Sequence, residues 1–424
     1  IKLGFISFGG PAGQIAIMHE YVVTQKKWIS NSRFFHALNY CMLLPGPEAQ
    51  QLATYIGWLL HGRLGGLAAG IFFVLPSMFI LLGLSVIYVS YGNVPWIYAL
   101  FTGLKPAVIA IVILALYKIG KRSLKSIFHV VVAVAAFVCI FFLNIPFPLI
   151  ILGAITVGAV VGKLWPGILK AQDGHAASSD DGETGYYLNK HSAPPEEGFR
   201  WSKLAKKTAS ALLLWVLPFI LFYLFTSDFA FWRTLSVFFT QAAFVTFGGA
   251  YAVLPYVAQV SVEKLGWLSS LQMVDGLALG ETTPGPLIMV LAYVGFMAGY
   301  NHYQGSLLMG AVGLGAATFF TFLPCFLFIF AGAPVIERSH GNKRLREVLE
   351  LVTAAVVGVV LNLTIYLGKA VLFPDGFSWP GLDYASLAWV AVSFVAMYRF
   401  KVGMLTWIAV SALFGLVMFL LTAS

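Results

Sequence analysis

The chain has 424 residues, of which 59% are hydrophobic and only 10% carry a charge. Soluble domains average about 25% charged residues, so this composition excludes a soluble globular protein. The formal net charge of +9 comes from Lys and Arg residues that lie mostly in short connections between apolar stretches. Such a distribution encodes membrane topology and does not form the basic face that nucleic acid needs, so we expect the lipid bilayer as a partner and no nucleic acid.

Apolar stretches near or above the ~20 residues that cross the hydrocarbon core recur along the chain. They predict an all-α polytopic membrane protein. Because the sequence starts at Ile1, we expect the chain to begin inside its first membrane segment, with no cleavable signal. The longer apolar stretches cover residues 64–90, 98–117, 126–143, 147–164, 208–226, 305–333, 348–368, 383–398 and 402–422.

A polar segment divides the chain into two membrane domains. Residues 170–200 are rich in small and charged residues and are too hydrophilic to bury in lipid. We predict an N-terminal repeat over 1–165, a cytoplasmic linker over 166–207 and a C-terminal repeat over 208–424. Within the last domain, 208–226 is expected to be an extra crossing helix.

The two domains resemble each other at a fixed offset of 239 residues. A somewhat larger offset relates Lys105 to Thr353. Internal duplication is typical of secondary transporters, whose substrate site lies between the repeats near the bilayer midplane. The matching segments are Ser7-Phe8-Gly9-Gly10 with Thr246-Phe247-Gly248-Gly249, Trp28 with Trp267, and Pro45-Gly46-Pro47 with Pro284-Gly285-Pro286.

Basic residues occupy opposite connections in the two copies. Lys26, Lys27 and Arg33 lie in a first-half connection whose second-half equivalent has no net positive charge. Further along, the second half holds the basic connection, from Arg338 to Arg346. The positive-inside rule therefore predicts an inverted repeat, with the C-terminus outside.

Each half also contains apolar segments that Gly and Pro interrupt. Residues 34–60 break at Pro45-Gly46-Pro47, which leaves arms of roughly a dozen residues, too short to cross a bilayer. We predict a re-entrant hairpin there and a second one at Gly9-Gly10-Pro11, where a kinked spanning helix is the alternative. Broken backbone is tolerated in a membrane only inside protein or around a wet cavity, so the breaks indicate a site.

The breaks suit an anionic ligand. A helix that starts after a break presents free amides and a positive dipole end, and glycine lets a ligand approach the backbone. The alternative is that the breaks only shape helix packing. The predicted substrate-binding residues are Ser7, Phe8, Gly9, Gly10, Pro11, Gln14, Pro45, Gly46, Pro47, Gln50, Lys105, Thr246, Gly248, Gly249, Thr283, Pro284, Gly285 and Pro286.

Few ionisable residues lie within the apolar segments. Lys105 is one, and we predict that it supplies positive charge to an anion pathway, with snorkelling to the interface as the alternative. Glu48 and Glu281 flank the two Pro-Gly-Pro turns. Each is a candidate either to carry a coupling proton or to cap a helix start.

Enzyme and metal signatures are missing from the sequence. It contains no G-x-S-x-G, no H-E-x-x-H and no phosphate-binding loop, so we expect neither an enzyme nor an ATP-driven pump, and no cofactor. Its three cysteines, Cys41, Cys139 and Cys325, have no metal-ligand spacing, so no metal site is expected.

The motifs together closely resemble the chromate ion transporter family in its two-domain form. The resemblance rests on the runs Ser7 to Ala16, Leu44 to Gln51 and Gly103 to Val108, and it covers nearly the whole chain. The second copy departs from it at Ala250, which replaces a proline. The resemblance implies chromate efflux and chromate resistance, through a multi-pass carrier of antiparallel halves in the bacterial inner membrane.

We therefore expect a secondary transporter that exports chromate, a tetrahedral dianion. Moving one negative charge outward gains ~2.3 kcal/mol per 100 mV of inside-negative potential, so export needs no ATP. A transporter of sulfate or another oxyanion and a passive anion channel are the alternatives. The small-residue face from Gly62 to Gly70 is a candidate contact for a homodimer.

Overall fold

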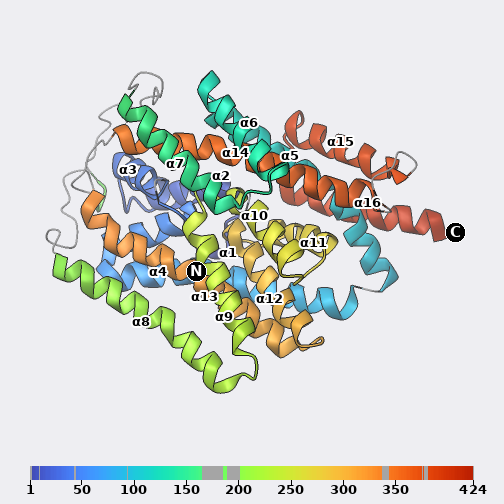
Figure 1. Ribbon diagram of the computed structural model, residues 1–424, viewed down its shortest axis with the longest axis horizontal. Coiled ribbons are helices and arrows are strands. Elements are labelled where there is room, and N and C mark those ends of the chain that lie inside the picture. Colours follow the sequence, from blue (N-terminus) through green and yellow to red (C-terminus); the bar gives the residue numbers. More distant parts are fainter. Residues whose placement is uncertain are drawn as a thin grey trace.

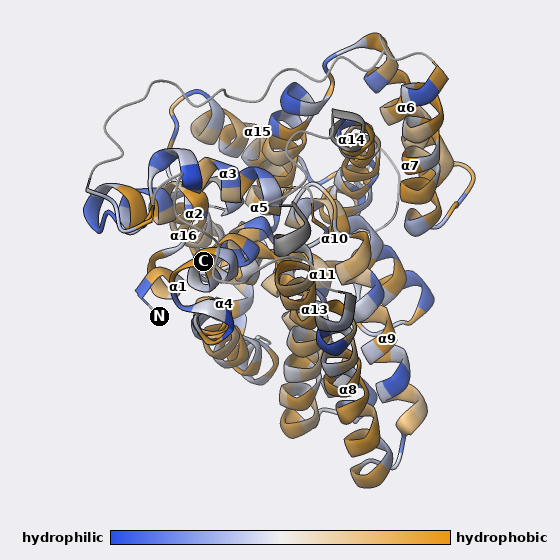
Figure 2. Ribbon diagram, turned by 90° about the vertical axis from the view of Figure 1, so that its left-hand side faces the viewer, coloured by the Kyte–Doolittle hydropathy of each residue, from blue (hydrophilic) through white to orange (hydrophobic). Residues whose placement is uncertain are grey.

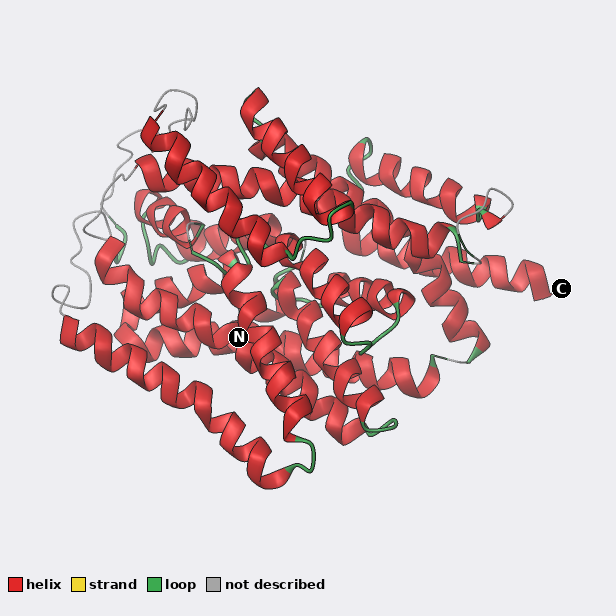
Figure 3. Cartoon of the chain, in the orientation of Figure 1, coloured by secondary structure: helices red, strands yellow, loops and turns green. Residues whose placement is uncertain are grey.

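The computed structural model describes residues 2–8, 10–42, 44–92, 94–164, 185–188, 201–336, 343–374, 376 and 381–423. These residues form helices joined by turns (Figure 3). In the described ranges, seven helices are long and apolar enough to cross a membrane, and four further apolar helices have 10–17 residues. The all-α, multi-pass fold class predicted from the sequence is confirmed.

The first half contains seven α-helices and one π-helical turn. In chain order they are α1 (Lys2–Ile6), α2 (Gly10–His19), η1 (Glu20–Gln25), α3 (Asn31–Cys41), α4 (Glu48–Tyr91), α5 (Pro95–Ser123), α6 (Ile127–Phe141) and α7 (Phe147–Leu164). The apolar stretches predicted in this half coincide with the long arm of α4 and with α5, α6 and α7.

The second half repeats this order after one extra helix. Its elements are α8 (Trp201–Phe225), α9 (Phe229–Val245), α10 (Ala250–Ala258), η2 (Gln259–Lys264), α11 (Ser270–Thr282), η3 (Leu287–Met289), α12 (Val290–His302), α13 (Leu307–Ile336), α14 (Lys343–Leu372), α15 (Tyr384–Tyr398) and α16 (Met404–Ala423). The extra helix, α8, lies along one edge of the molecule, away from α15 and α16 (Figure 1).

The backbone geometry itself repeats at the offset of 239 residues. The π-helical turns η1 and η2 begin and end at equivalent positions. Ser30 and Ser269 are also equivalent, and each caps the helix that follows through its side-chain hydroxyl. The two tryptophans at this offset, Trp28 and Trp267, each donate their amide at 2.8 Å to equivalent carbonyls, those of Val22 and Ser261. The duplication seen in the sequence therefore extends to local structure.

Helices α11 and α12 are the antiparallel arms of a hairpin. A Cβ on Gly276 would collide with Tyr293, and one on Gly280 would collide with Val290, so residues equally far from the Pro284–Pro286 turn face each other. Each arm has 13 residues. At 1.5 Å per residue an arm is about 20 Å long, against the ~30 Å of a hydrocarbon core, as expected for the predicted hairpin.

Helices α9 and α10 also fold back on each other, around Thr246–Gly249. The Tyr256 hydroxyl donates to Gln241 Oε1 at 3.3 Å, and the Tyr256 ring lies 5.4 Å from that of Phe238. A continuous helix would hold residues 238 and 256 about 27 Å apart. In the second half, the chain therefore reverses at this break, which favours the hairpin over the kinked helix.

Helix α4 is two antiparallel arms rather than one long helix. The backbone leaves the helical conformation at His61 and Gly62, where φ is −138° and 62°. A Cβ on Gly57 would lie 2.5 Å from the Gly65 carbonyl oxygen, so the arms cross at backbone contact. Gly295 and Gly313 make the same kind of crossing between α12 and α13.

This crossing changes the interpretation of the Gly62–Gly70 face, which we predicted as a homodimer contact. A Cβ on Gly66 would lie 2.8 Å from Phe330, and one on Gly70 would lie 2.5 Å from Phe326. Gly66 and Gly70 are therefore buried against α13 of the same chain, whereas Leu64 and Leu67 are exposed. The glycines give no support to a homodimer.

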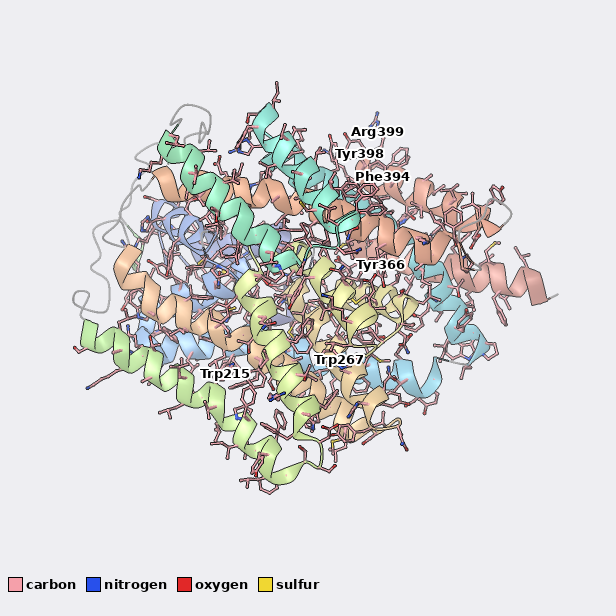
Figure 4. The ribbon with its side chains drawn as sticks, in the orientation of Figure 1. Trp215, Trp267, Tyr366, Phe394, Tyr398 and Arg399 are labelled. Atoms are coloured by element: carbon pink, nitrogen blue, oxygen red, sulfur yellow. The ribbon has the colours of Figure 1, made fainter. Side chains whose placement is uncertain are left out.

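The outer surfaces of the helices suit lipid. Most helix residues are coloured as hydrophobic in Figure 2, and hydrophilic residues gather at turns and helix ends. The extra helix α8 is the extreme case, since only 6% of the residues in its most apolar stretch are buried. It packs against α9 and α13, and the Trp215 indole donates to Thr240 Oγ1 of α9 at 2.9 Å (Trp215 is labelled in Figure 4).

A short piece of the linker contacts the first half. Tyr187 and Leu188 donate their amides to the carbonyls of Lys27 and Trp28 at 3.0 Å, and Ser30 donates its amide to the Leu188 carbonyl at 2.8 Å. Most of the predicted linker, 166–207, lies outside the described residues. The docked piece, residues 185–188, lies on the loop between η1 and α3.

The helix crossing in α4 can be tested with alanine. Gly57→Ala should lower the thermal unfolding midpoint of the purified protein, because overpacking at a backbone contact costs about 1–3 kcal/mol. Gly83→Ala is the matched control in the same helix, where a Cβ meets nothing within 4 Å. Equal midpoints for the two variants would contradict the close crossing.

Candidate functional site

The broken segments of the two halves meet in pairs. The Gly46 amide donates to the Thr246 carbonyl at 2.7 Å, and the Gly285 amide donates to the Ser7 carbonyl at 2.8 Å. Ser7 is equivalent to Thr246, and Gly46 is equivalent to Gly285. Each half therefore gives the other the same hydrogen bond that it receives, which is the pattern of contacts across a two-fold axis.

The long helices α4 and α13 each contact the Pro-Gly-Pro turn of the opposite half. A Cβ on Gly46 would lie 2.8 Å from Cys325 Sγ of α13, and one on Gly285 would lie 2.8 Å from Ser77 Cβ of α4. Ser77 and Cys325 follow the equivalent prolines, Pro76 and Pro324. Each Pro-Gly-Pro turn is thus packed against the proline-containing helix of the opposite half. With φ of 125° and 100°, both central positions require glycine.

Glutamine side chains hold the turns in this conformation. Gln14 Nε2 donates to the Gly285 carbonyl at 2.5 Å, and Gln51 Nε2 donates to the Pro45 carbonyl at 2.7 Å. Gln50 Nε2 donates to Thr54 Oγ1 at 3.1 Å. The bonds from Gln14 and Gln51 cover carbonyl oxygens that would otherwise present negative charge to an anion.

Two kinds of helix start occur in the hairpins. Those at the hairpin bases, α3 and α11, are capped by Ser30 and Ser269. Those next to the breaks, α4, α10 and η3, have Pro47, Gly249 and Pro286 at the N-cap, and no side chain caps them. First-turn amides without a cap retain hydrogen-bonding capacity for a ligand. The Gly46 and Gly285 amides do not, because they bond to the opposite half.

Several buried hydroxyl and amide oxygens near the turns have no hydrogen-bond partner among the described residues. They belong to Ser7, Ser77, Gln50, Gln51 and Thr321. Ser7 and Ser77 both contact the Gly285 turn, one through its carbonyl and one through its side chain. A buried polar atom without a partner is costly, and a cluster of them is expected where a polar ligand binds.

The site is closed to solvent in this conformation. Ser7, Gln50, Gln51 and Thr246 have no exposed surface. Thr283 is 5% exposed. A hydrated ion therefore does not reach these side chains in this conformation.

Lys105 is buried between α5 and α11, and its ammonium lies beside a carboxylate that the sequence analysis missed. Lys105 Nζ is 3.8 Å from Asp275 Oδ1, and it lies over the Tyr98 ring, 5.4 Å from the centroid. Tyr88 donates its hydroxyl to Asp275 Oδ2 at 2.9 Å. Lys105 and Asp275 are 8% and 5% exposed. A carboxylate in the apolar run of α11 was itself a signal of function.

The two candidate coupling carboxylates have different surroundings. Glu281 is 4% exposed and accepts a hydrogen bond from the Tyr251 hydroxyl at 2.5 Å, next to the Thr283–Pro286 turn. Glu48 is the first residue of α4 and is half-buried. They are not repeat mates, since Glu281 corresponds to Met42 and Glu48 to Leu287.

The remaining predicted site residues lie at the same breaks. Gly248 faces Thr353, the repeat mate of Lys105, whose Cγ2 would be 3.3 Å from an added Cβ. Gly10 and Gly249 have φ of 71° and 97°. Phe8, Pro11 and Pro284 flank the turns, and Gly9 lies outside the described residues.

A separate pocket of about 400 Å³ lies at the bases of the second-half hairpins, and residues from α9 and from the turns around Gly266 and His302 line it. There the Phe231 amide and the His302 ring hold the pKa of Asp228 below its usual range. The predicted site residues are not among those lining it. In the described part of the chain, no three His, Cys, Asp or Glu residues are grouped to hold a metal.

The exchanged contact at Gly285 can be tested by substitution. Gly285→Ala should lower the transport rate more than about tenfold, because alanine is strained at this φ and its methyl meets Ser77. Gly153→Ala, in open space on α7, is the control. Full activity of Gly285→Ala would remove this turn from the site.

Known proteins resemble both halves of the chain. The chromate transporter family matches residues 1–159 and 233–416, which are the two halves without the linker and α8. A chromate transport protein of Cupriavidus metallidurans is 28% identical over 98% of this chain and 91% of its own length. One of Pseudomonas aeruginosa is 31% identical over 87% and 79%. An uncharacterised transporter of Methanocaldococcus jannaschii is 26% identical over 98% and 92%. No solved structure matches the chain. The chain is a multi-pass membrane protein that belongs to the chromate transporter family.

Proposed function

We propose that this protein exports chromate from the bacterial cytoplasm across the inner membrane and thereby confers chromate resistance. The observation that carries the proposal is the meeting of the broken segments between the halves, through the reciprocal bonds of Gly46 and Gly285. Broken backbone, uncapped helix starts and unpartnered hydroxyls are the features of an oxyanion site. Family membership supplies chromate as the substrate.

The proposed site binds a tetrahedral dianion mainly with neutral donors. First-turn amides of α4 and α10, together with the hydroxyls of Ser7 and Ser77, reach an oxyanion without a full positive charge at each oxygen. Lys105 adds one formal charge from α5. A site with one cation and many dipoles binds a dianion weakly enough to release it, which a carrier requires.

The reciprocal contacts support a two-fold relation between the halves. If its axis lies in the membrane plane, the halves form the inverted repeat predicted from the basic loops, with α8 as the crossing that turns the second half over. The first-half hairpins then enter from the cytoplasm and the second-half hairpins from outside. Movement of one half against the other opens the site to one side at a time.

Glu281 is the better candidate for a coupling proton, because it is buried beside a turn and is held by Tyr251. Glu48, at the start of α4, fits the helix-capping alternative. Sulfate has the same shape and charge as chromate, and backbone amides distinguish the two poorly. Sulfate transport, a passive channel and a homodimer stay predictions.

Transport can be measured with radiolabelled chromate and inside-out vesicles from expressing cells. Uptake above that of empty vesicles should saturate, and a lumen-positive potential set with an ionophore should increase it, because the carried charge is negative. Excess sulfate reports selectivity. Uptake that rises linearly with chromate and shows no saturation would favour the channel. No uptake at any potential would overturn chromate export.

The inverted topology makes a separate prediction. A tag after Ser424 should be accessible to a membrane-impermeant label in intact cells, while a tag inserted in the linker should be labelled only after lysis. Protection of the C-terminal tag in intact cells would contradict the inverted arrangement, whatever the substrate is.

A further inference from the structure

We propose that Asp275 is the internal counter-ion of Lys105 and that the transported anion displaces it. In the empty carrier the carboxylate neutralises the buried ammonium, and in the loaded carrier an oxyanion takes its place. The proposal rests on the proposed function, because it assigns a competitor to the oxyanion at Lys105, a predicted substrate-binding residue. It adds a residue, Asp275, that sets affinity and release.

Lys105 and Asp275 form a loose ion pair. A direct ammonium–carboxylate hydrogen bond is ~2.7–2.9 Å long, whereas Lys105 Nζ and Asp275 Oδ1 are 3.8 Å apart. Asp275 Oδ1 accepts no hydrogen bond in the described part of the chain. The contacts of the ammonium there are this ion pair and the face of the Tyr98 ring. Both groups therefore retain unused hydrogen-bonding capacity.

Tyr88 explains why the pair does not close. Its hydroxyl donates to the other carboxylate oxygen, Oδ2, at 2.9 Å. Its ring also packs against Tyr293 of α12, with centroids 5.9 Å apart. The carboxylate is thus held through Oδ2, while Oδ1 stays 3.8 Å from the ammonium, within its attraction but outside hydrogen-bonding distance.

Because the Lys105 ammonium is buried, it needs a negative partner, and a transported anion can replace Asp275 as that partner. An isolated ammonium at 8% exposure would be strongly destabilised, so the empty carrier needs a negative partner close by. A tightly bonded partner would exclude the substrate. An anion that forms direct hydrogen bonds with the ammonium gains more than the loose pair provides, and the carboxylate keeps its bond to Tyr88 when displaced.

The pair also joins the two halves. Lys105 belongs to α5 of the first half, and Asp275 belongs to α11, an arm of a second-half hairpin. Its repeat-related counterpart cannot form the same ion pair, because Thr353 replaces the lysine and His36 the aspartate. Displacing Asp275 removes an attraction between the halves at one position only. Anion binding therefore favours relative movement of the halves, since it changes their interaction energy.

The experiment compares transport kinetics of single and double variants. In Asp275→Asn, which keeps the shape, the anion meets no competitor, so KM should fall about tenfold and the maximal rate should fall with it because release slows. In Lys105→Gln, KM should rise, because the unpaired carboxylate repels the anion. The double variant should regain expression lost in Lys105→Gln and yet keep a KM above wild type.

A merely structural pair predicts a different result. If neutrality were all that mattered, the double variant would transport with the wild-type KM, and Asp275→Asn would change expression without lowering KM. Either outcome overturns the proposal. Asp228→Asn is the matched control, because Asp228 is an acidic residue of the same half at the helix cap of α9, and its KM should equal that of wild type.

A thermal-shift measurement separates this proposal from the proposed function. Chromate and sulfate are titrated into the detergent-purified proteins, and the midpoint concentration of stabilisation should be lower for Asp275→Asn than for wild type. If wild type transports no chromate but this ordering holds for either anion, export fails while the counter-ion stands. The same midpoint concentration in both proteins contradicts the counter-ion even where wild type transports chromate.

Discussion

Lipid offers no hydrogen bonds to a broken backbone, and this constraint governs the arrangement of the protein. The interrupted segments at Gly46 and Gly285 are stable only because protein groups satisfy them. Each is satisfied by the carbonyl of the opposite half, from Thr246 or Ser7. The need to pair these groups brings the hairpin turns together between the halves, and the same need leaves helix starts nearby with unused amides. The proposed substrate site thus follows from how the breaks are stabilised.

Duplication explains the framework, and divergence between the copies explains the chemistry. Equivalent positions have kept the glycines, prolines and capping serines that shape the hairpins. The ionisable positions have not been kept. Lys105 corresponds to Thr353, and Glu281 to Met42. An ideal two-fold site would present identical groups to both membrane faces, whereas this one has its cation on α5 and its carboxylates on α11. The charge pattern is therefore directional although the scaffold is nearly symmetric.

Much of the fold can be predicted from the sequence, because long apolar stretches indicate membrane helices and Pro-Gly-Pro indicates hairpin turns. Residues 147–164 were predicted with the bounds that α7 has. The contacts between turns were not predictable, since pairing of Gly46 with Thr246 depends on how two distant segments pack. Asp275 was not predicted although its apolar context was visible in the sequence, because it lies ten residues before Gly285 and so does not flank a break. The glycines after Gly62 were assigned to a dimer, since small residues allow close helix contacts but do not say with which helix.

A linker joins the two halves in one polypeptide, and its piece at Tyr187 and Leu188 is docked on the first half, on the loop at Lys27 and Trp28. Tethered partners meet at an effective concentration in the millimolar range, far above that of two separate membrane proteins. Formation of the contact between the turns therefore does not depend on expression level. A fused pair also assembles with fixed stoichiometry, so no half remains with unsatisfied turns in the bilayer.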